Sequence, residues 1–311
     1  MTVLQPKPLE AQNPGIPLDA DWVSRASIDA SAIEREAEEI TKRAVVANQS
    51  QHDLLRAISL MDLTTLADDD TEERVRKLCA RARRPLSPEL TRRLIPAAAS
   101  LEVAAVCIYH QFIKTALHEL QGTSIKIATV SADFPKGLAP LEDRINQIHR
   151  SVEDGAHEID VVIKREHVLN GDWQALYDEI SAFKAACTPK LMKVILATGE
   201  LQAPENIARA SMVAMMAGAD FIKTSTGKEA VNATIPAAIV MTRAIYDYER
   251  KTGISVGFKP AGGIRTAKQA LEYMAVVKQE LGERWLQPKL FRIGASSMLD
   301  DIERTLQQLA G

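Results

Sequence analysis

Three charged residues of this sequence stand in apolar runs, where burial makes a charge costly. Lys223 follows two bulky apolar residues, Lys259 closes the run 254–258, and Asp160 interrupts the run 158–163. Desolvating an ammonium group costs several kcal/mol unless the group is paired or loses its proton. A neutral lysine is a nucleophile that can form a Schiff base with a carbonyl compound. A lone lysine at a strand end more often meets solvent or a carboxylate, but three such residues together indicate lysine-based carbonyl chemistry.

The two lysines lie on neighbouring predicted strands, so their ammonium groups can approach each other. A nearby like charge and burial both depress the pKa of a lysine. We therefore expect Lys259 to keep Lys223 neutral, although the spacing does not settle which lysine is the nucleophile. Asp160 could move protons to and from a carbinolamine and an enamine through a water, or serve as a structural salt bridge. We expect it nearer Lys259, holding that side chain charged.

Other polar residues stand at or near the ends of predicted strands and are candidates for contacts with a substrate. They are Asp62, Thr64, Cys107, Lys193 and Thr226. Cys107 is most simply a small core residue. Lys193 fits a polar network better than it fits a second nucleophile.

The last strand ends carry the residue types of a phosphate site. Glycine pairs allow backbone N–H groups to approach an anion, serines can donate hydroxyl hydrogen bonds, and a helix N-terminus attracts negative charge. The candidates are Gly227, Lys228, Gly262, Gly263, Gly294, Ser296 and Ser297. The glycines could instead shape turns and the serines cap a helix. Their occurrence on neighbouring loops favours phosphate.

Strand and helix patterns alternate eight times over residues 56–311. This repeat predicts a closed (β/α)8 TIM barrel, in which chemistry sits at the C-terminal ends of the strands. An open doubly wound sheet is the alternative, but no glycine-rich dinucleotide motif follows the first strand. The expected strands are 58–64, 104–109, 125–130, 159–163, 191–196, the segment at Lys223, 254–259 and 290–293. The expected helices are 69–83, 112–120, 141–152, 173–186, 204–216, 235–250, 267–281 and 298–309.

Residues 1–55 form a predicted N-terminal extension to this barrel. Its first 30 or so residues contain four prolines and are expected to be disordered or loosely packed, and helices are expected over 31–46 and 51–57. Because the charged strand-end residues all come later, we expect the extension to be dispensable for chemistry. Residues 84–103 are expected to be irregular.

Composition narrows the class of protein further. The chain has 311 residues, 46% of them hydrophobic, and a formal charge of -3, which gives no reason to expect a nucleic-acid or anionic-membrane partner. No run reaches the ~18 apolar residues of a membrane span. Three widely spaced cysteines argue against disulfides, and six histidines without ligand spacing argue against a metal. We expect a cytoplasmic protein without cofactors, and the sequence leaves open whether it is a homo-oligomer.

Seven stretches of the sequence resemble the deoxyribose-phosphate aldolase family. They are 61–66, 160–162, 197–201, 221–228, 231–234, 257–263 and 294–297. Phe-Ile-Lys-Thr-Ser-Thr-Gly-Lys and Gly-Phe-Lys-Pro-Ala-Gly-Gly are each specific. The resemblance implies a metal-free class I aldolase that reversibly cleaves 2-deoxy-D-ribose 5-phosphate to acetaldehyde and D-glyceraldehyde 3-phosphate, in deoxyribonucleoside catabolism. It also implies that Lys223 forms the Schiff base, Lys259 perturbs it and Asp160 transfers protons.

The sequence departs from the shorter bacterial members in its extension and in Ile163-Lys164-Arg165, which replaces Phe-Pro-Tyr as in animal-type enzymes. No tyrosine follows Tyr273, whereas some members carry one near a flexible C-terminal tail. The alternatives are a Schiff-base aldolase for another sugar phosphate, a metal-dependent aldolase and an inactive barrel that serves as a scaffold. Product analysis, chelators and a turnover assay would distinguish them.

Overall fold

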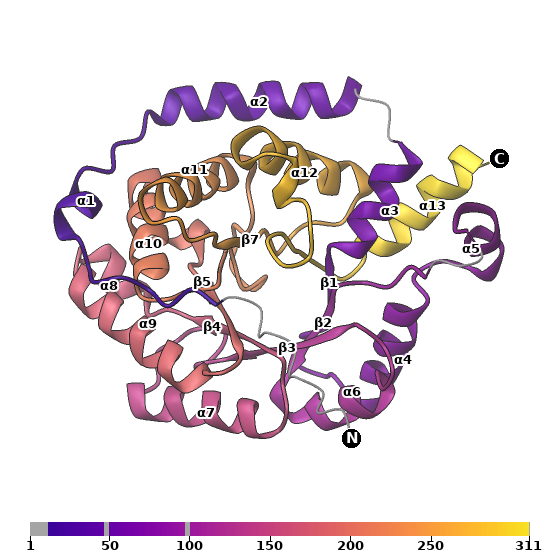
Figure 1. Ribbon diagram of the computed structural model, residues 1–311, viewed down its shortest axis with the longest axis horizontal. Helices are drawn as coiled ribbons and strands as arrows, with labels where there is room; N and C mark the ends of the chain where they lie inside the picture. Colours follow the sequence, from indigo (N-terminus) through magenta and orange to yellow (C-terminus); the bar gives the residue numbers. More distant parts are fainter. Residues whose placement is uncertain (1–11, 47–49, 97–99, 311) are drawn as a thin grey trace, which may run out of the picture.

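Eight parallel strands form a barrel with helices around its outside (Figure 1). The computed structural model describes residues 12–46, 50–96 and 100–310. The order β7-β6-β5-β4-β3-β2-β1-β8 is closed by two bridges, Phe258 to Phe291 and Ala261 to Gly294. The strands are β1 (Met61–Thr64), β2 (Ala105–Tyr109), β3 (Lys126–Ser131), β4 (Glu158–Val162), β5 (Leu191–Ile195), β6 (Phe221–Lys223), β7 (Gly257–Lys259) and β8 (Ile293–Ala295). The predicted barrel is confirmed.

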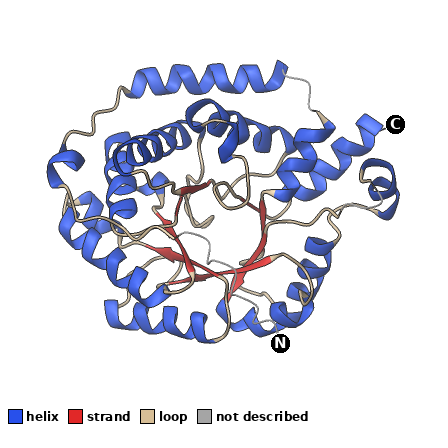
Figure 2. Cartoon of the chain, in the orientation of Figure 1, coloured by secondary structure: helices blue, strands red, loops and turns tan. Residues whose placement is uncertain are grey.

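Helices cover every side of the barrel in the described part of the chain (Figure 2). They are α1 (Ala20–Ser24), α2 (Ala30–Val46), α3 (Gln51–Ser59), α4 (Glu72–Arg83), α5 (Pro88–Leu94), α6 (Ile113–Glu119), α7 (Leu141–Glu153), α8 (Arg165–Leu169), α9 (Trp173–Cys187), α10 (Pro204–Met216), α11 (Ile235–Thr252), α12 (Ala267–Leu281) and α13 (Met298–Ala310). None of the described helices is long and apolar enough to cross a membrane.

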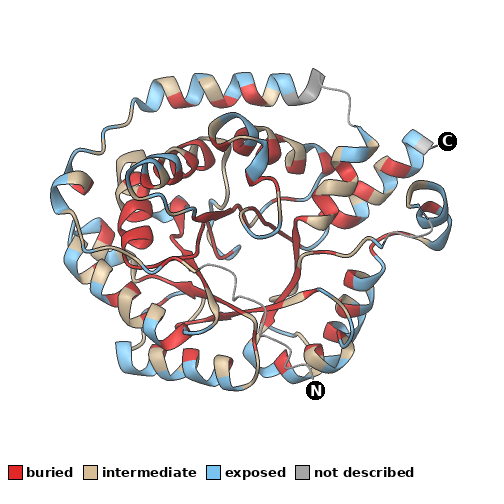
Figure 3. Cartoon of the chain, in the orientation of Figure 1, coloured by how far each residue is buried: buried red, intermediate tan, exposed pale blue. Residues whose placement is uncertain are grey.

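Helix starts follow local capping chemistry. Thr234 and Thr266 each accept a hydrogen bond from the backbone of the first turn of α11 and α12, and Gln269 completes a capping box with Thr266. The strands between the helices are almost wholly buried (Figure 3), as expected for a parallel sheet inside a helical shell. Each strand therefore delivers its C-terminal residues to the same end of the barrel.

Several predicted element boundaries were wrong. The first strand begins at Met61 rather than at residue 58, because α3 continues to Ser59. The last strand begins at Ile293, later than the predicted 290–293. The segment 84–103 contains α5, which Ser87 caps and Pro88 opens, and helix α8 was not predicted at all.

The expected loose packing of the first 30 residues was wrong for residues 12–30, and residues 1–11 lie outside the described part. Asn13 is buried and donates its side-chain amide to the carbonyls of Met215 and Ala219 at 2.7 and 2.9 Å. The Trp22 ring stacks on Tyr248 with their centroids 6.2 Å apart. Helix α2 then lies across α11 and α12, as Figure 1 shows. This N-terminal segment is packed because it carries its own apolar and amide anchors.

Candidate active site

Five charged side chains from five strands meet inside the barrel. Strand register explains the meeting: Lys223 of β6 lies opposite Lys259 of β7, and Asp160 of β4 lies opposite Lys193 of β5. Asp62 projects from β1. All five residues are buried. The structure therefore brings the predicted catalytic residues together with two of the predicted substrate-contact residues.

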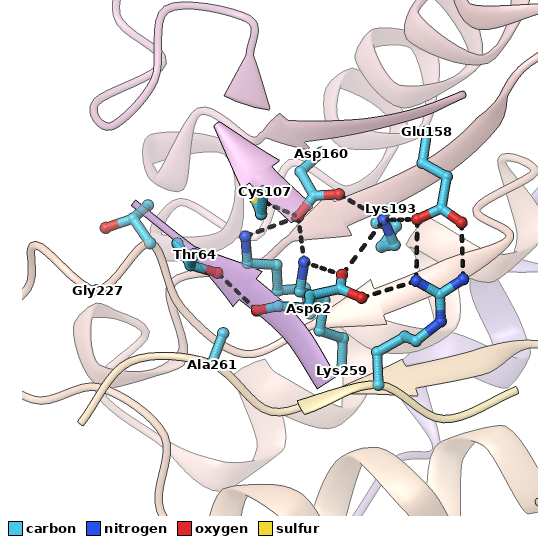
Figure 4. A network of polar contacts seen from close by, with 12 residues as sticks. Asp62, Thr64, Cys107, Glu158, Asp160, Lys193, Gly227, Lys259 and Ala261 are labelled. Atoms are coloured by element: carbon cyan, nitrogen blue, oxygen red, sulfur yellow. Dashed lines mark hydrogen bonds and ion pairs between the residues drawn. The ribbon is translucent and has the colours of Figure 1, made fainter. Parts of the chain in front are cut away.

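Asp160 is the centre of this cluster (Figure 4). Its Oδ2 atom lies 2.8 Å from Nζ of Lys223 and 2.8 Å from Nζ of Lys259, and its Oδ1 atom lies 2.9 Å from Nζ of Lys193. The expectation that Asp160 lies nearer Lys259 was wrong. Because Lys193 takes Oδ1, the other two lysines share Oδ2 equally.

Two further charged side chains, Arg292 and Glu158, extend the cluster toward the N-terminal end of the barrel. Neither was predicted from the sequence. Arg292 donates to Asp62 Oδ1 at 2.7 Å and to Glu158 Oε1 at 2.7 Å. Glu158 also accepts from Lys193 at 2.6 Å. Both residues carry a detectable signal, because each is a charge next to a buried apolar run, as Lys223 is.

The charges of the cluster stabilise one another against the cost of burial. Burial alone would raise the pKa of Asp160, but the charges of Lys193, Lys223 and Lys259 hold it well below its usual range. Burial alone would lower the pKa of Lys259, but Asp160 and Asp62 raise it above its ordinary value. Lys259 is therefore a cation and Asp160 a carboxylate anion in the resting site at neutral pH.

Other predicted substrate-contact residues line the cluster without being free for a ligand. Asp62 Oδ2 lies 2.5 Å from Lys259 Nζ. The Thr64 hydroxyl donates to the backbone carbonyl of Asp62 at 2.8 Å. The sulfur of Cys107 lies 4.0 Å from Asp160 Oδ2, and burial raises the pKa of its thiol. Cys107 is therefore a neutral wall residue beside the carboxylate.

The predicted phosphate loops lie side by side at the C-terminal end of the barrel. A Cβ atom added to Gly227 would lie 3.8 Å from the Cα atom of Gly262. Gly262 and Gly263 have φ of +87° and +79°, a conformation that favours glycine and turns the backbone after β7. Ser296 and Ser297 are exposed and immediately precede α13.

Two of the predicted phosphate contacts differ from expectation. The carboxylate of Glu229 accepts hydrogen bonds from the backbone N–H groups of Thr226 and Gly227 at 3.0–3.1 Å, so these groups are occupied. Lys228 reaches over to Asp68, with its Nζ atom 3.2 Å from the carboxylate.

Gly294 has a packing role rather than an open backbone. A Cβ atom there would lie 3.2 Å from Cε of Lys259 and 2.8 Å from Cβ of Ala261. The absent side chain therefore makes room for the lysine. Among the described residues, no group of three or more His, Cys, Asp or Glu side chains could hold a metal ion.

A buried lysine at the C-terminal end of a parallel barrel, beside a second lysine and a carboxylate, fits an enzyme of the aldolase class. Residues 56–303 match the family described as DeoC/LacD family aldolase. The chain is 50% identical over 301 residues to deoxyribose-phosphate aldolase of Homo sapiens, covering 96% of this chain and 95% of that protein. It is 51% identical over 295 residues to the Mus musculus protein of the same name, with coverages of 94% and 93%. The chain belongs to the deoxyribose-phosphate aldolase family.

Solved structures show the same fold at lower identity. A putative deoxyribose-phosphate aldolase from Toxoplasma gondii ME49 aligns with a TM-score of 0.71 at 23% identity, covering 84% of this chain and 96% of that chain. One from Coccidioides immitis aligns with a TM-score of 0.67 at 22% identity, covering 90% and 99%.

Proposed function

We propose that this chain is a class I aldolase that cleaves 2-deoxy-D-ribose 5-phosphate to acetaldehyde and D-glyceraldehyde 3-phosphate, with Lys223 as the Schiff-base residue. Family membership supports the activity. The assignment of Lys223 rests on one observation: among the described residues Asp160 is its only carboxylate partner, and Lys223 shares that oxygen with Lys259. Lys259 has Asp62 as an additional anion and stays a cation. Lys223 is therefore assigned as the nucleophile.

Covalent chemistry begins when the neutral Lys223 amine attacks the C1 aldehyde of the open-chain sugar and forms a carbinolamine. The carbinolamine oxygen leaves as water and an iminium ion remains. Removal of the C3 hydroxyl proton then breaks the C2–C3 bond, and its electron pair moves into an enamine as glyceraldehyde 3-phosphate departs. Protonation of the enamine at C2 and hydrolysis release acetaldehyde and restore the free amine.

Asp160 is the proposed proton carrier for these steps. Its carboxylate lies 2.8 Å from the Nζ atom on which the carbinolamine forms, which is within reach of a proton transfer directly or through one water. The lysines that surround Asp160 keep it ionised, so it acts first as a base. Lys259 stabilises the anionic form and does not react itself.

The phosphate is proposed to bind at the loops after β7 and β8, with Lys228 from the loop after β6. Support comes from the left-handed glycines 262 and 263, the exposed Ser296 and Ser297, and the positive N-terminal end of α13. Lys228 would exchange its contact with the exposed Asp68 for the phosphate. The chain thus binds small sugar phosphates and aldehydes, and we propose a cytoplasmic location in line with its three free cysteines.

The test is borohydride reduction in the presence of acetaldehyde, followed by peptide mass spectrometry. The proposal predicts one reduced adduct, on the peptide that contains Lys223, together with retro-aldol turnover of deoxyribose 5-phosphate. An adduct on Lys259 would reverse the roles of the two lysines. An adduct on Lys193 would defeat the assignment.

A further inference from the structure

The buried cluster carries more positive than negative side chains. Its cations are Lys193, Lys223, Lys259 and Arg292, and its carboxylates are Asp62, Glu158 and Asp160. With every group ionised, four positive charges face three negative charges. Loss of one proton from one lysine makes the cluster neutral. Burying an uncompensated charge is costly, so the interior favours that loss.

Ion pairing decides which lysine bears the surplus. Arg292 contacts both Asp62 and Glu158. Lys193 contacts Glu158 and Asp160, and Lys259 contacts Asp62 and Asp160. Among the described residues, Lys223 has an ion pair with Asp160 only. The surplus charge therefore falls on Lys223.

We propose that Arg292 and Glu158 are positioning residues that act together to set the protonation of Lys223 from the opposite side of the cluster. The inference rests on the proposed function of Lys223 as nucleophile. Arg292 occupies Asp62 Oδ1 at 2.7 Å, so Asp62 turns its other oxygen to Lys259. Glu158 holds Lys193, which in turn occupies Asp160 Oδ1. Because Asp62 and Glu158 are engaged by other cations, Lys223 is left with Asp160 Oδ2, which it shares with Lys259.

The geometry places this pair one layer below the reacting lysine. Glu158 lies two residues before Asp160 on β4, so both side chains point into the barrel. Arg292 directly precedes β8, and its guanidinium lies 5.8 Å from the centre of the Phe221 ring. Its contacts with Asp62 and Glu158 raise its pKa, so it is a permanent cation.

Several other charged and titratable groups surround Lys223 besides Arg292 and Glu158. The adjacent strands contribute Asp62, Cys107, Asp160, Lys193 and Lys259 to the same interior, and Lys228 faces Asp68 at the loops. Cys107 stays neutral because burial raises the pKa of its thiol. Arg292 and Glu158 therefore form a charge pair that can be altered without touching Lys223 or its shared oxygen.

The inference is tested by the pH dependence of borohydride trapping with acetaldehyde, whose acid limb reports deprotonation of Lys223. Arg292→Met removes the surplus positive charge, so the acid limb moves to higher pH. Glu158→Gln increases the surplus, so the limb moves to lower pH. Each shift is expected to be about one pH unit, the typical effect of one charge in a poorly screened interior. The double variant restores the charge balance and returns the limb to its wild-type position.

Two controls separate charge from structural damage. Arg144 and Glu179 form another buried ion pair, between α7 and α9, so Arg144→Met should lower stability without moving the limb. Arg292→Lys keeps the charge but loses the two-pronged contact, so the rate should fall with the limb in place. If Arg292→Met does not fold, Glu158→Gln decides alone.

Shifts in the same direction, or an unmoved limb in folded Glu158→Gln, would overturn the inference. A double variant that remains shifted would also overturn it. If the wild-type protein is trapped on a residue other than Lys223, the proposed function fails. That outcome is seen before any variant is compared, so it is distinct from a failure of the inference about Arg292 and Glu158.

Discussion

Lys223 and Lys259 lie opposite each other in the register of β6 and β7, and their Nζ atoms lie at the same distance, 2.8 Å, from one oxygen of Asp160. The two lysines differ in their remaining contacts. Lys259 has Asp62 at 2.5 Å, whereas Lys223 shares its only carboxylate partner among the described residues. This asymmetry distinguishes the proposed nucleophile from the proposed cation.

The first prediction concerns this pair. Lys223→Leu should abolish both trapping and turnover, because it removes the amine. Lys259→Leu should leave the nucleophile present but slow turnover by at least a hundredfold, and should move the pH optimum upward by about one unit because a neighbouring cation is lost. Trapping rates and pH–rate profiles measure both effects. A trapped adduct in Lys223→Leu would contradict the assignment.

The second prediction concerns the phosphate. Ser296→Asp places a negative charge before α13, so KM for deoxyribose 5-phosphate should rise about tenfold or more, while kcat for unphosphorylated deoxyribose changes little. Ser255→Asp is the matched control, because Ser255 is exposed and precedes β7 at the other end of the barrel. An unchanged preference for the phosphorylated sugar in Ser296→Asp would place the phosphate elsewhere.

The sequence predicts the barrel and its charged interior because both leave local signals. Eight strand-helix alternations indicate the barrel, and a charge inside an apolar run marks Lys223, Lys259 and Asp160. How Asp160 is shared could not be predicted. Its two oxygens are divided among three lysines by the stagger of four strands, which depends on tertiary contacts and not on spacing along the chain.

Arg292 and the N-terminal segment show two further limits of the sequence. Arg292 lies within the predicted strand 290–293, and the sequence does not show which way its side chain points, because only barrel closure aims it at Asp62. The prolines around Asn13 predict irregular chain, which hides its role as an anchor. Irregular backbone can still be tightly held, since the Asn13 amide pairs with carbonyls more than two hundred residues away.

The third prediction concerns the role of residues 1–55. A chain that begins at residue 50 should still trap acetaldehyde on Lys223, because the cluster lies wholly within the barrel. It should be markedly less stable, because Val23, Ile33 and Ile40 are buried in the intact protein and their partners on the barrel would be exposed. Thermal unfolding and trapping yield measure the two effects.

A point variant at Asn13 separates the contribution of its side-chain amide from that of the helices in residues 1–55. Asn13→Ala removes the side-chain donor of the Ala219 carbonyl, while the Met215 carbonyl keeps the backbone N–H of Gly218, and should cost about 1–3 kcal/mol of unfolding free energy, with turnover unchanged. A folded truncated chain without trapping activity would show instead that the extension completes the active site.

The last prediction concerns Asp62, which pairs with both Lys259 and Arg292. Asp62→Asn leaves two buried cations short of an anion and should cost about 3–5 kcal/mol of unfolding free energy at pH 7.

Burial alone would raise the pKa of Asp62, but Lys259, Arg292 and Lys193 lower it below its ordinary value of ~3.9. A lowered pKa stabilises the fold above the ordinary value, and this stabilisation is lost as the pH falls toward the folded-state value. The stability gap between wild type and variant should therefore be full at pH 7 and shrink below about pH 4. Urea unfolding at several pH values measures the gap, and Asp69→Asn, at an exposed pair with Arg74, should leave stability unchanged throughout. A gap that stays constant from pH 7 to pH 3 would mean that Asp62 stabilises the barrel through packing and not through its charge.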